Sequence, residues 1–176
     1  MNLQDRNIAI TDLETSGDIF GEHEILEIGL VLVNPKTFEI IDTLNVKIKP
    51  EHIENAVPAA LERNGYKKEN WQNAVSLKEA VEQYASKTHD AIFYAYNVSF
   101  DWGFMSDAFK KTGVKNLMDY HRIDLMSMVY LKYKNQLKSL SFNAVSELIG
   151  IPKEPMPHTA LNGAMQAYYL LKSLVS

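Results

Sequence analysis

The segment IAITDLETSG, residues 8–17, places two carboxylates, Asp12 and Glu14, two positions apart at the end of an apolar run. In an extended strand, residues two apart point to the same face of the sheet. We therefore expect the two carboxylates side by side at the tip of a short buried strand over residues 8–11. Like charges this close repel each other unless a cation lies between them. The alternative is local, with one acid in a turn and the other capping a helix.

The composition is that of a globular domain without disulfides. The chain has 176 residues, of which 46% are hydrophobic and 23% charged, and no cysteine. We expect one domain over residues 1–176. No apolar stretch approaches the roughly 18 residues of a membrane-spanning helix, and residues 1–7 do not resemble a signal peptide, so we expect a cytoplasmic protein with no membrane contact. The net charge of −4 excludes nucleic-acid binding through bulk positive charge.

The hydrophobic pattern predicts a mixed sheet flanked by helices. An apolar run, a turn at Asn34-Pro35 and an alternating stretch follow the first strand, which favours an antiparallel meander of three strands. Strands then alternate with helices, so we expect an α/β fold with five strands. The predicted strands are 8–11, 25–33, 38–48, 90–96 and 120–123. The predicted helices are 59–63, 76–87, 99–111, 124–133, 141–149 and 159–174.

Two other segments carry polar residues where predicted elements meet. Asp101 lies in the first turn of the helix that follows the fourth strand, and His158 lies just before the last helix. Sites in α/β proteins assemble at the carboxyl ends of strands. Each residue also has a structural interpretation, because an acid is favourable at a helix N-terminus and a loop histidine is usually exposed.

The three segments together resemble the DEDDh branch of the 3′–5′ exonucleases. These DnaQ-like enzymes include polymerase proofreading subunits, oligoribonuclease and ribonuclease T. Their motifs are Asp-x-Glu-Thr, Asn-x-x-Phe-Asp and His-x-Ala-x-x-Asp, and the segment 26–29 is similar to their second strand. The resemblance extends from Ile8 to about Ala167. The matching positions are Asp12, Glu14 and Thr15; Asn97, Phe100 and Asp101; and His158 and Ala160, followed by Gly163.

The resemblance implies a ribonuclease-H-like fold and a site for two Mg²⁺ or Mn²⁺ ions. Asp12, Glu14 and Asp101 would be the metal ligands, since hard cations prefer carboxylate oxygens. His158 would be the general base that takes a proton from the attacking water.

The same resemblance implies how the substrate is held. Backbone groups near Leu13 and Thr15 would bind the terminal nucleotide, and Asn97 and Phe100 would complete the substrate site. The helical spacing of Phe100 and Phe104 also favours core packing for Phe100.

Gly163 departs from the family pattern, because the fourth metal-binding aspartate belongs there. Three carboxylates balance the four charges of two divalent ions incompletely, so we expect one ion to bind more weakly. Glycine near the start of a helix costs about 0.5–1 kcal/mol relative to alanine. Three explanations remain open: the chain is a natural member that has lost activity, it is an inactivated variant of an active enzyme, or another acid, Glu154 or Asp124, reaches the site.

These observations lead to three hypotheses. The first is a metal-dependent 3′–5′ exonuclease that hydrolyses single-stranded DNA or RNA from its 3′ end, with activity impaired at Gly163 and a homodimer or a polymerase as further partners. The second is an inactive module of the same fold that binds nucleic-acid ends or a protein. The third discards the resemblance and predicts that Asp12, Glu14 and Asp101 lie far apart.

Overall fold

A five-stranded sheet forms the centre of the protein in a computed structural model that describes residues 2–175. The strand order is β3-β2-β1-β4-β5. β1 pairs with β2, and β2 with β3, in antiparallel fashion, while β4 is parallel to β1 and β5 is parallel to β4. The predicted mixed sheet with an antiparallel meander is confirmed. The strands are β1 Ile8–Thr15, β2 Ile25–Val33, β3 Ile40–Lys47, β4 Ile92–Ala95 and β5 Arg122–Asp124.

β1 is longer than predicted, and this changes the setting of the two acids. The prediction ended the strand at Thr11, but pairing with β2 continues through Thr15. Asp12 and Glu14 therefore lie inside the strand and not at its tip. On its other edge, β1 pairs with β4 only from Ile8 to Ile10. The two acids therefore lie in the part of β1 that has no β4 residue paired with it.

The third strand is shorter than the predicted range 38–48. Phe38 has a φ of 55° and belongs to the turn that Asn34 organises, so the strand begins only at Ile40. The alternation of apolar residues still marks the buried face correctly, because Leu44, Val46 and Ile48 are buried.

The helices begin and end close to the predicted residues because their caps are local. Ser76 forms a capping box with Glu79, and Asp124 and Ser141 cap the helices predicted at 124–133 and 141–149. No helix within residues 2–175 is long and apolar enough to cross a membrane. The helices are α1 Pro58–Arg63, α2 Leu77–Lys87, α3 Val98–Thr112, α4 Leu125–Tyr133, α5 Phe142–Ile149 and α6 Ala160–Val175, with short 3₁₀ turns at Leu3–Asp5, Ile53–Asn55 and Lys68–Trp71.

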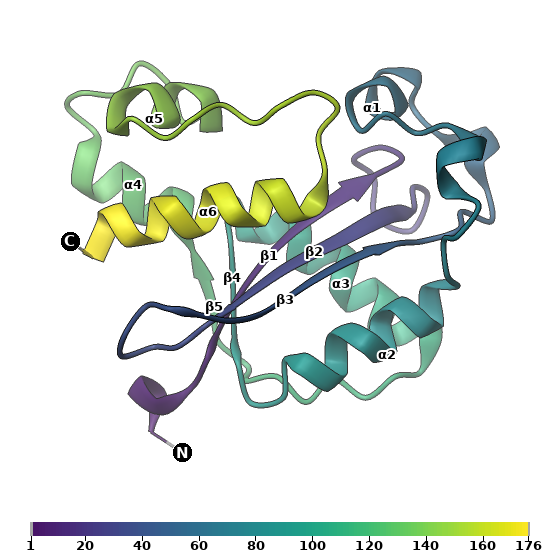
Figure 1. Ribbon diagram of the computed structural model, residues 1–176, viewed down its shortest axis with the longest axis horizontal. Coiled ribbons are helices and arrows are strands. Elements are labelled where there is room, and N and C mark those ends of the chain that lie inside the picture. The colour runs from purple at the N-terminus through teal and green to yellow at the C-terminus, as the bar shows by residue number, and fades with distance from the viewer. Residues whose placement is uncertain (1, 176) are drawn as a thin grey trace.

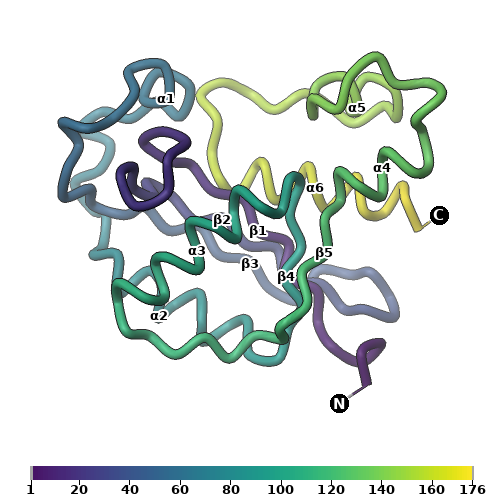
Figure 2. Tube along the Cα trace, turned by 180° about the vertical axis from the view of Figure 1, so that it is seen from behind, coloured from purple at the N-terminus to yellow at the C-terminus, as the bar shows by residue number. Residues whose placement is uncertain are grey.

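Helices cover both faces of the sheet. α6 lies over one face (Figure 1), and α2 and α3 lie over the other, which the reverse view shows (Figure 2). Because side chains alternate along a strand, Ile8 and Ile10 pack toward α6, whereas Ala9 and Leu13 pack toward α2 and α3. Asp12 and Glu14 continue the face of Ile8 and Ile10, so the acids belong to the face that α6 covers.

α6 approaches the sheet closely at Gly29. A Cβ placed on Gly29 would lie 2.5 Å from the backbone nitrogen of Leu161 and would overlap the carbonyl group of Ala160. Gly29 pairs with Asp12 across the two strands. The absence of a side chain at Gly29 therefore brings the first turn of α6 next to the position of Asp12.

We predict that Gly29→Ala destabilises the protein, because its methyl group meets backbone atoms that cannot turn away. The free energy of unfolding should fall by about 1–3 kcal/mol, the usual effect of overpacking. Chemical denaturation measures it, with Thr43→Ala on the exposed side of β3 as the control. Equal stability of the two variants would contradict the close approach.

Candidate active site

The three predicted metal ligands come from two neighbouring elements. Asp12 and Glu14 lie on β1, and Asp101 lies in the first turn of α3, which begins three residues after β4. The Asp101 side chain is buried, with 3% of the residue exposed, while Asp12 and Glu14 are half-buried. Since β4 is the parallel neighbour of β1, the start of α3 lies beside the far half of β1.

The electrostatics of the three acids show that they lie together. Burial, and then the charges of Asp101 and Glu14, raise the pKa of Asp12 well above its ordinary value. Burial also raises the pKa of Asp101, against hydrogen bonds from its own backbone and from that of Leu13. The hypothesis of scattered acids, which predicted these side chains far apart, is therefore wrong.

Glu14 has the most informative environment of the three. Burial, and then the charges of Glu154 and Glu27, raise the pKa of Glu14 to about 8, while Arg63 lowers it. Glu27 is opposite Glu14 in the pairing of β1 with β2. Carboxylates that repel each other in this way are stabilised by a cation, and their oxygens suit a hard divalent ion. The oxygens around Glu14 therefore fit a divalent ion, and Glu14 is one of the ligands that the resemblance implies.

His158 lies at the edge of the same site. A cavity of about 290 Å³ is lined by Asp12, Glu14, His158 and Gly163, among others. The imidazole is half-buried, and its Nδ1 is 3.2 Å from Oε2 of Glu154. The backbone N–H of His158 donates to the carbonyl oxygen of Arg63 at 3.0 Å, which fixes the loop before α6 against α1 (Figure 1).

Of the two acids considered as substitutes for the missing aspartate, only Glu154 lines this cavity. Asp124 instead caps α4, where its carboxylate accepts hydrogen bonds from the backbone of Met126 and Ser127. The same carboxylate accepts from the backbone N–H groups of Asn97 and Val98, so it fixes the start of α3. Asp124 is thus committed to holding the backbone at the turn between β4 and α3.

Gly163 faces Asp12 directly. A Cβ placed on Gly163 would lie 2.6 Å from Cγ of Asp12 and would overlap one of its carboxylate oxygens. The structure therefore places position 163 at the acid cluster, as the motif predicts. It also shows that the Asp12 carboxylate occupies the space that a side chain at position 163 would need.

A second cavity of about 290 Å³ adjoins the acids. Leu13, Thr15 and Phe100 line it, together with Arg63, which also lines the first cavity. The Thr15 hydroxyl donates to the carbonyl oxygen of Gly17 at 2.6 Å, so this side chain holds the loop after β1. Phe100 packs on Phe104 with ring centroids 5.1 Å apart, as core packing predicts, and it also lines the cavity.

Asn97 lies away from both cavities. It is exposed, with a φ of 67°, and its side-chain oxygen accepts a hydrogen bond from Ser99. The structure therefore gives it a part in the turn that starts α3 and no contact with either cavity.

Three residues near the site were missed by the sequence analysis. Glu27 had a signal, since it is an acid inside an apolar strand, and it is 1% exposed. Phe20 is 50% exposed, and its ring lies edge-on to that of Phe104 at 5.0 Å, but nothing in its local sequence marked it. Arg63 likewise ends a short helix without any motif.

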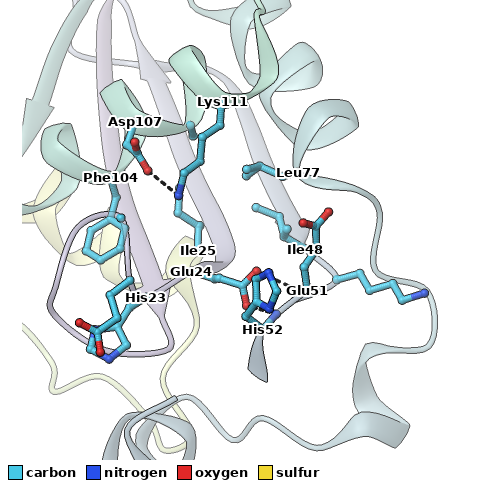
Figure 3. A pocket seen from close by; sticks show the side chains of 14 residues that line it. His23, Glu24, Ile25, Ile48, Glu51, His52, Leu77, Phe104, Asp107 and Lys111 are labelled. Atoms are coloured by element: carbon cyan, nitrogen blue, oxygen red, sulfur yellow. Dashed lines mark hydrogen bonds and ion pairs between the residues drawn. The ribbon is translucent and has the colours of Figure 1, made fainter. Parts of the chain in front are cut away.

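A further cavity, of about 340 Å³, holds none of the predicted site residues (Figure 3). Three of its charged side chains have partners. Lys111 pairs with Asp107 at 2.9 Å, and the Glu24 carboxylate accepts from the backbone N–H groups of Glu51 and His52. The Glu24 contacts tie the loop after β3 to the start of β2, whereas the Lys111 pair lies within α3.

Known proteins have sequences similar to that of this chain. The PolC-type DNA polymerase III of Thermotoga maritima is 29% identical over 149 residues, which are 84% of this chain and 10% of that protein. The 3′–5′ exonuclease DinG of Staphylococcus aureus is 32% identical over 108 residues, 61% of this chain and 12% of that protein. The chain thus spans about a tenth of the length of these relatives.

Solved structures share the fold. The 3′-exonuclease that recognises the histone mRNA stem-loop has a TM-score of 0.75 at 17% identity, over 99% of this chain and 66% of that one. Exonuclease I of E. coli in complex with a dA16 oligonucleotide has a TM-score of 0.78 at 15% identity, over 96% of this chain and 41% of that one. The predicted ribonuclease-H-like fold is therefore confirmed.

The sequence model of the RNase_T family, described as exonuclease, matches residues 9–171. This range contains Asp12 and Glu14 on β1, Asp101 at the start of α3, and His158 in the loop before α6. The DEDDh resemblance drawn from the motifs is confirmed, and the chain belongs to the RNase_T exonuclease family.

Proposed function

We propose that this chain is a metal-dependent 3′–5′ exonuclease acting on single-stranded DNA or RNA. The observation that supports the proposal is that Asp12, Glu14 and His158 line one cavity, while the buried Asp101 lies close enough to raise the pKa of Asp12. The family membership supports it, because the same residues match the motifs of that family.

Asp12, Glu14 and Asp101 would hold Mg²⁺ or Mn²⁺. Such ions make a nearby water more acidic and stabilise negative charge on the scissile phosphate. Burial raises the pKa of all three carboxyl groups, and the charge of Glu14 adds to the rise at both Asp12 and Asp101. With position 163 occupied by glycine, we expect one of the two ions to be held more weakly.

His158 is proposed to take the proton of the attacking water. Its Nδ1 faces Glu154, and none of the described residues bonds its other ring nitrogen, Nε2. A neutral imidazole whose Nδ1–H donates to a carboxylate has Nε2 free to accept a proton. The Glu154 carboxylate would then also favour the charged ring that forms.

The terminal nucleotide is proposed to occupy the second cavity, against Leu13, Thr15 and Phe100. The exposed ring of Phe20, which lies beside Phe100 at 6.4 Å, extends the aromatic surface available to a base. Arg63 lines both cavities and would bind a backbone phosphate between them. Arg63 is the one arginine or lysine among the described residues that line the two cavities, so in an acidic chain it would contribute much of the protein's attraction for phosphate.

The comparisons support a single-stranded substrate without deciding between DNA and RNA. One structural neighbour was solved with a DNA oligonucleotide, and another recognises the end of an mRNA stem-loop. A proofreading role beside a polymerase is the narrower form of the proposal, and the PolC-type relative supports it. A homodimer stays an expectation of the sequence resemblance.

Gly163 favours a second candidate function. A chain with one carboxylate fewer could keep the fold and bind nucleic-acid ends without cleaving them. Binding of an oligonucleotide in Ca²⁺, together with no cleavage in Mg²⁺ or Mn²⁺, would identify this inactive module.

We predict that the protein shortens a 5′-labelled single-stranded oligonucleotide stepwise from its 3′ end in Mn²⁺ or Mg²⁺. His158→Ala should lower the rate by about 100- to 10,000-fold, the usual contribution of a general base. His89→Ala, at an exposed histidine outside the site, should have no effect. Gel analysis of the products measures the rate and the direction of cleavage.

Gly163→Asp is assayed beside the unaltered chain, because it restores the aspartate of the family motif. Asp12 must turn before the new carboxylate can enter. The exonuclease proposal fails if neither protein shortens the strand in either metal ion. It also fails if blocking the 3′ end leaves the rate unchanged.

We further predict that the metal-free protein loses stability as the pH rises from 5 to 8. The pKa of Glu14 rises from 4.5 to about 8 on folding, so in this window the folded state holds a proton that the unfolded state has released. Unfolding is then favoured by increasing pH. Calorimetry in EDTA measures the effect, and Glu14→Gln should flatten the slope. A natural chain that gains stability over this range would contradict the raised pKa.

A further inference from the structure

The carboxylate missing at position 163 has a neighbour that can replace it. Glu154 belongs to the loop before α6 and reaches the cavity that Asp12, Glu14 and Gly163 also line. Only 12% of its side chain is exposed, which is unusual for a loop glutamate. The position of Glu154 beside other acids needs an explanation, because each added negative charge makes the metal-free site less stable.

Glu154 is held in place by its own loop and by α6. Its Oε1 accepts a hydrogen bond from the backbone N–H of Thr159 at 3.1 Å, and its Oε2 lies 3.2 Å from Nδ1 of His158. The loop itself is tied to α6, because the Gln166 amide donates to the carbonyl oxygen of Pro152 at 2.7 Å. The carboxylate is therefore positioned before any ligand arrives.

The geometry suits one divalent ion. Ligand atoms of Glu14, Glu154 and His158 all lie within 4.8 Å of one another. Two oxygens on the same Mg²⁺, Mn²⁺ or Ca²⁺ ion are each about 2.0–2.6 Å from it, so they lie within roughly 4–5 Å of each other. A carboxylate that accepts one hydrogen bond on each oxygen still has lone pairs for a metal ion.

A second, independent observation also points to a cation. Glu27, which pairs with Glu14 across the strands, is 1% exposed, and its Oε1 has no hydrogen-bond partner among the described residues. Buried carboxylate oxygens normally have a hydrogen-bond partner, and a cation held by the neighbouring Glu14 would offset the charge of Glu27. Arg63, at the mouth of the cavity, is the cation that lowers the pKa of Glu14, and it is exposed.

We propose that Glu154 supplies the carboxylate that position 163 lacks, and that Glu14 and Glu154 together hold a divalent cation beside His158. This inference rests on the proposed function for the role of the ion, but the ion-binding claim can be tested without it. Because Asp12 fills the space beside Gly163, the fourth acid enters the cavity from the loop and not from α6.

Titration calorimetry of the full chain with Mn²⁺ tests the proposal, with Glu154→Gln as the variant. Glutamine keeps the size of the side chain and can still accept from Thr159. Removing this ligand should weaken Mn²⁺ binding by about tenfold or more, since even outer partners of metal ligands contribute 10- to 100-fold. Glu147→Gln, at an exposed position of α5, is the matched control and should bind like the natural chain.

Thermal unfolding provides the second measurement. In EDTA, Glu154→Gln should be at least as stable as the natural chain, because one of several like charges is gone. Added Mn²⁺ should raise the unfolding temperature of the natural chain and of Glu147→Gln, but should raise that of Glu154→Gln much less.

Unchanged Mn²⁺ affinity in Glu154→Gln would overturn the inference, even if nuclease activity were lost, because Glu154 would then act only by positioning His158. Loss of Mn²⁺ affinity in a chain that cleaves no oligonucleotide would keep the metal site and refute the exonuclease proposal.

Discussion

The site depends on the close contact between the first turn of α6 and Gly29 on β2. Gly29 is opposite Asp12, so the helix that approaches this glycine also brings Gly163 against the Asp12 carboxylate. Two residues further along β2, Glu27 accepts a hydrogen bond from the backbone N–H of Ala160 at 3.3 Å. The close approach of α6 to Gly29, which has no side chain, therefore fixes the position of α6, of the loop that carries His158, and of the acids relative to one another.

The cost of this arrangement is electrostatic. The face of β1 and β2 that packs apolar residues against α6 continues into Asp12, Glu14 and Glu27, which share a partly buried space. Burial and mutual repulsion raise the pKa values of Asp12 and Glu14, so the folded chain holds protons there when no cation is bound. The same features that disfavour the empty site favour a divalent ion, and this links the stability of the fold to its proposed chemistry.

Position 163 illustrates how a site can change without losing its geometry. An aspartate there would compete for space with Asp12, and the glycine removes both that conflict and one charge. Glu154 enters the cavity from the adjoining loop, where the backbone of Thr159 and the ring of His158 hold it. The number of carboxylates around the cavity is thereby maintained by a residue from a different element.

Much of the fold follows from local sequence signals. The capping residues Ser76, Asp124 and Ser141 begin helices at the predicted places, because a cap needs only the next three residues. The glycine at position 113 ends α3 for the same local reason. The end of β1 was predicted wrongly, because pairing with β2 extends a strand whose own residues indicate a turn.

The sequence by itself predicted which acids and which histidine form the site, since the order and spacing of three motifs select Asp12, Glu14, Asp101 and His158. Only the tertiary structure decided between Glu154 and Asp124, placed Arg63 between the two cavities, and showed Asp12 against Gly163. The physical reason is that these contacts join residues far apart in the chain, such as Glu27 and Ala160. No local pattern records a distance between segments that meet only when α6 packs on the sheet.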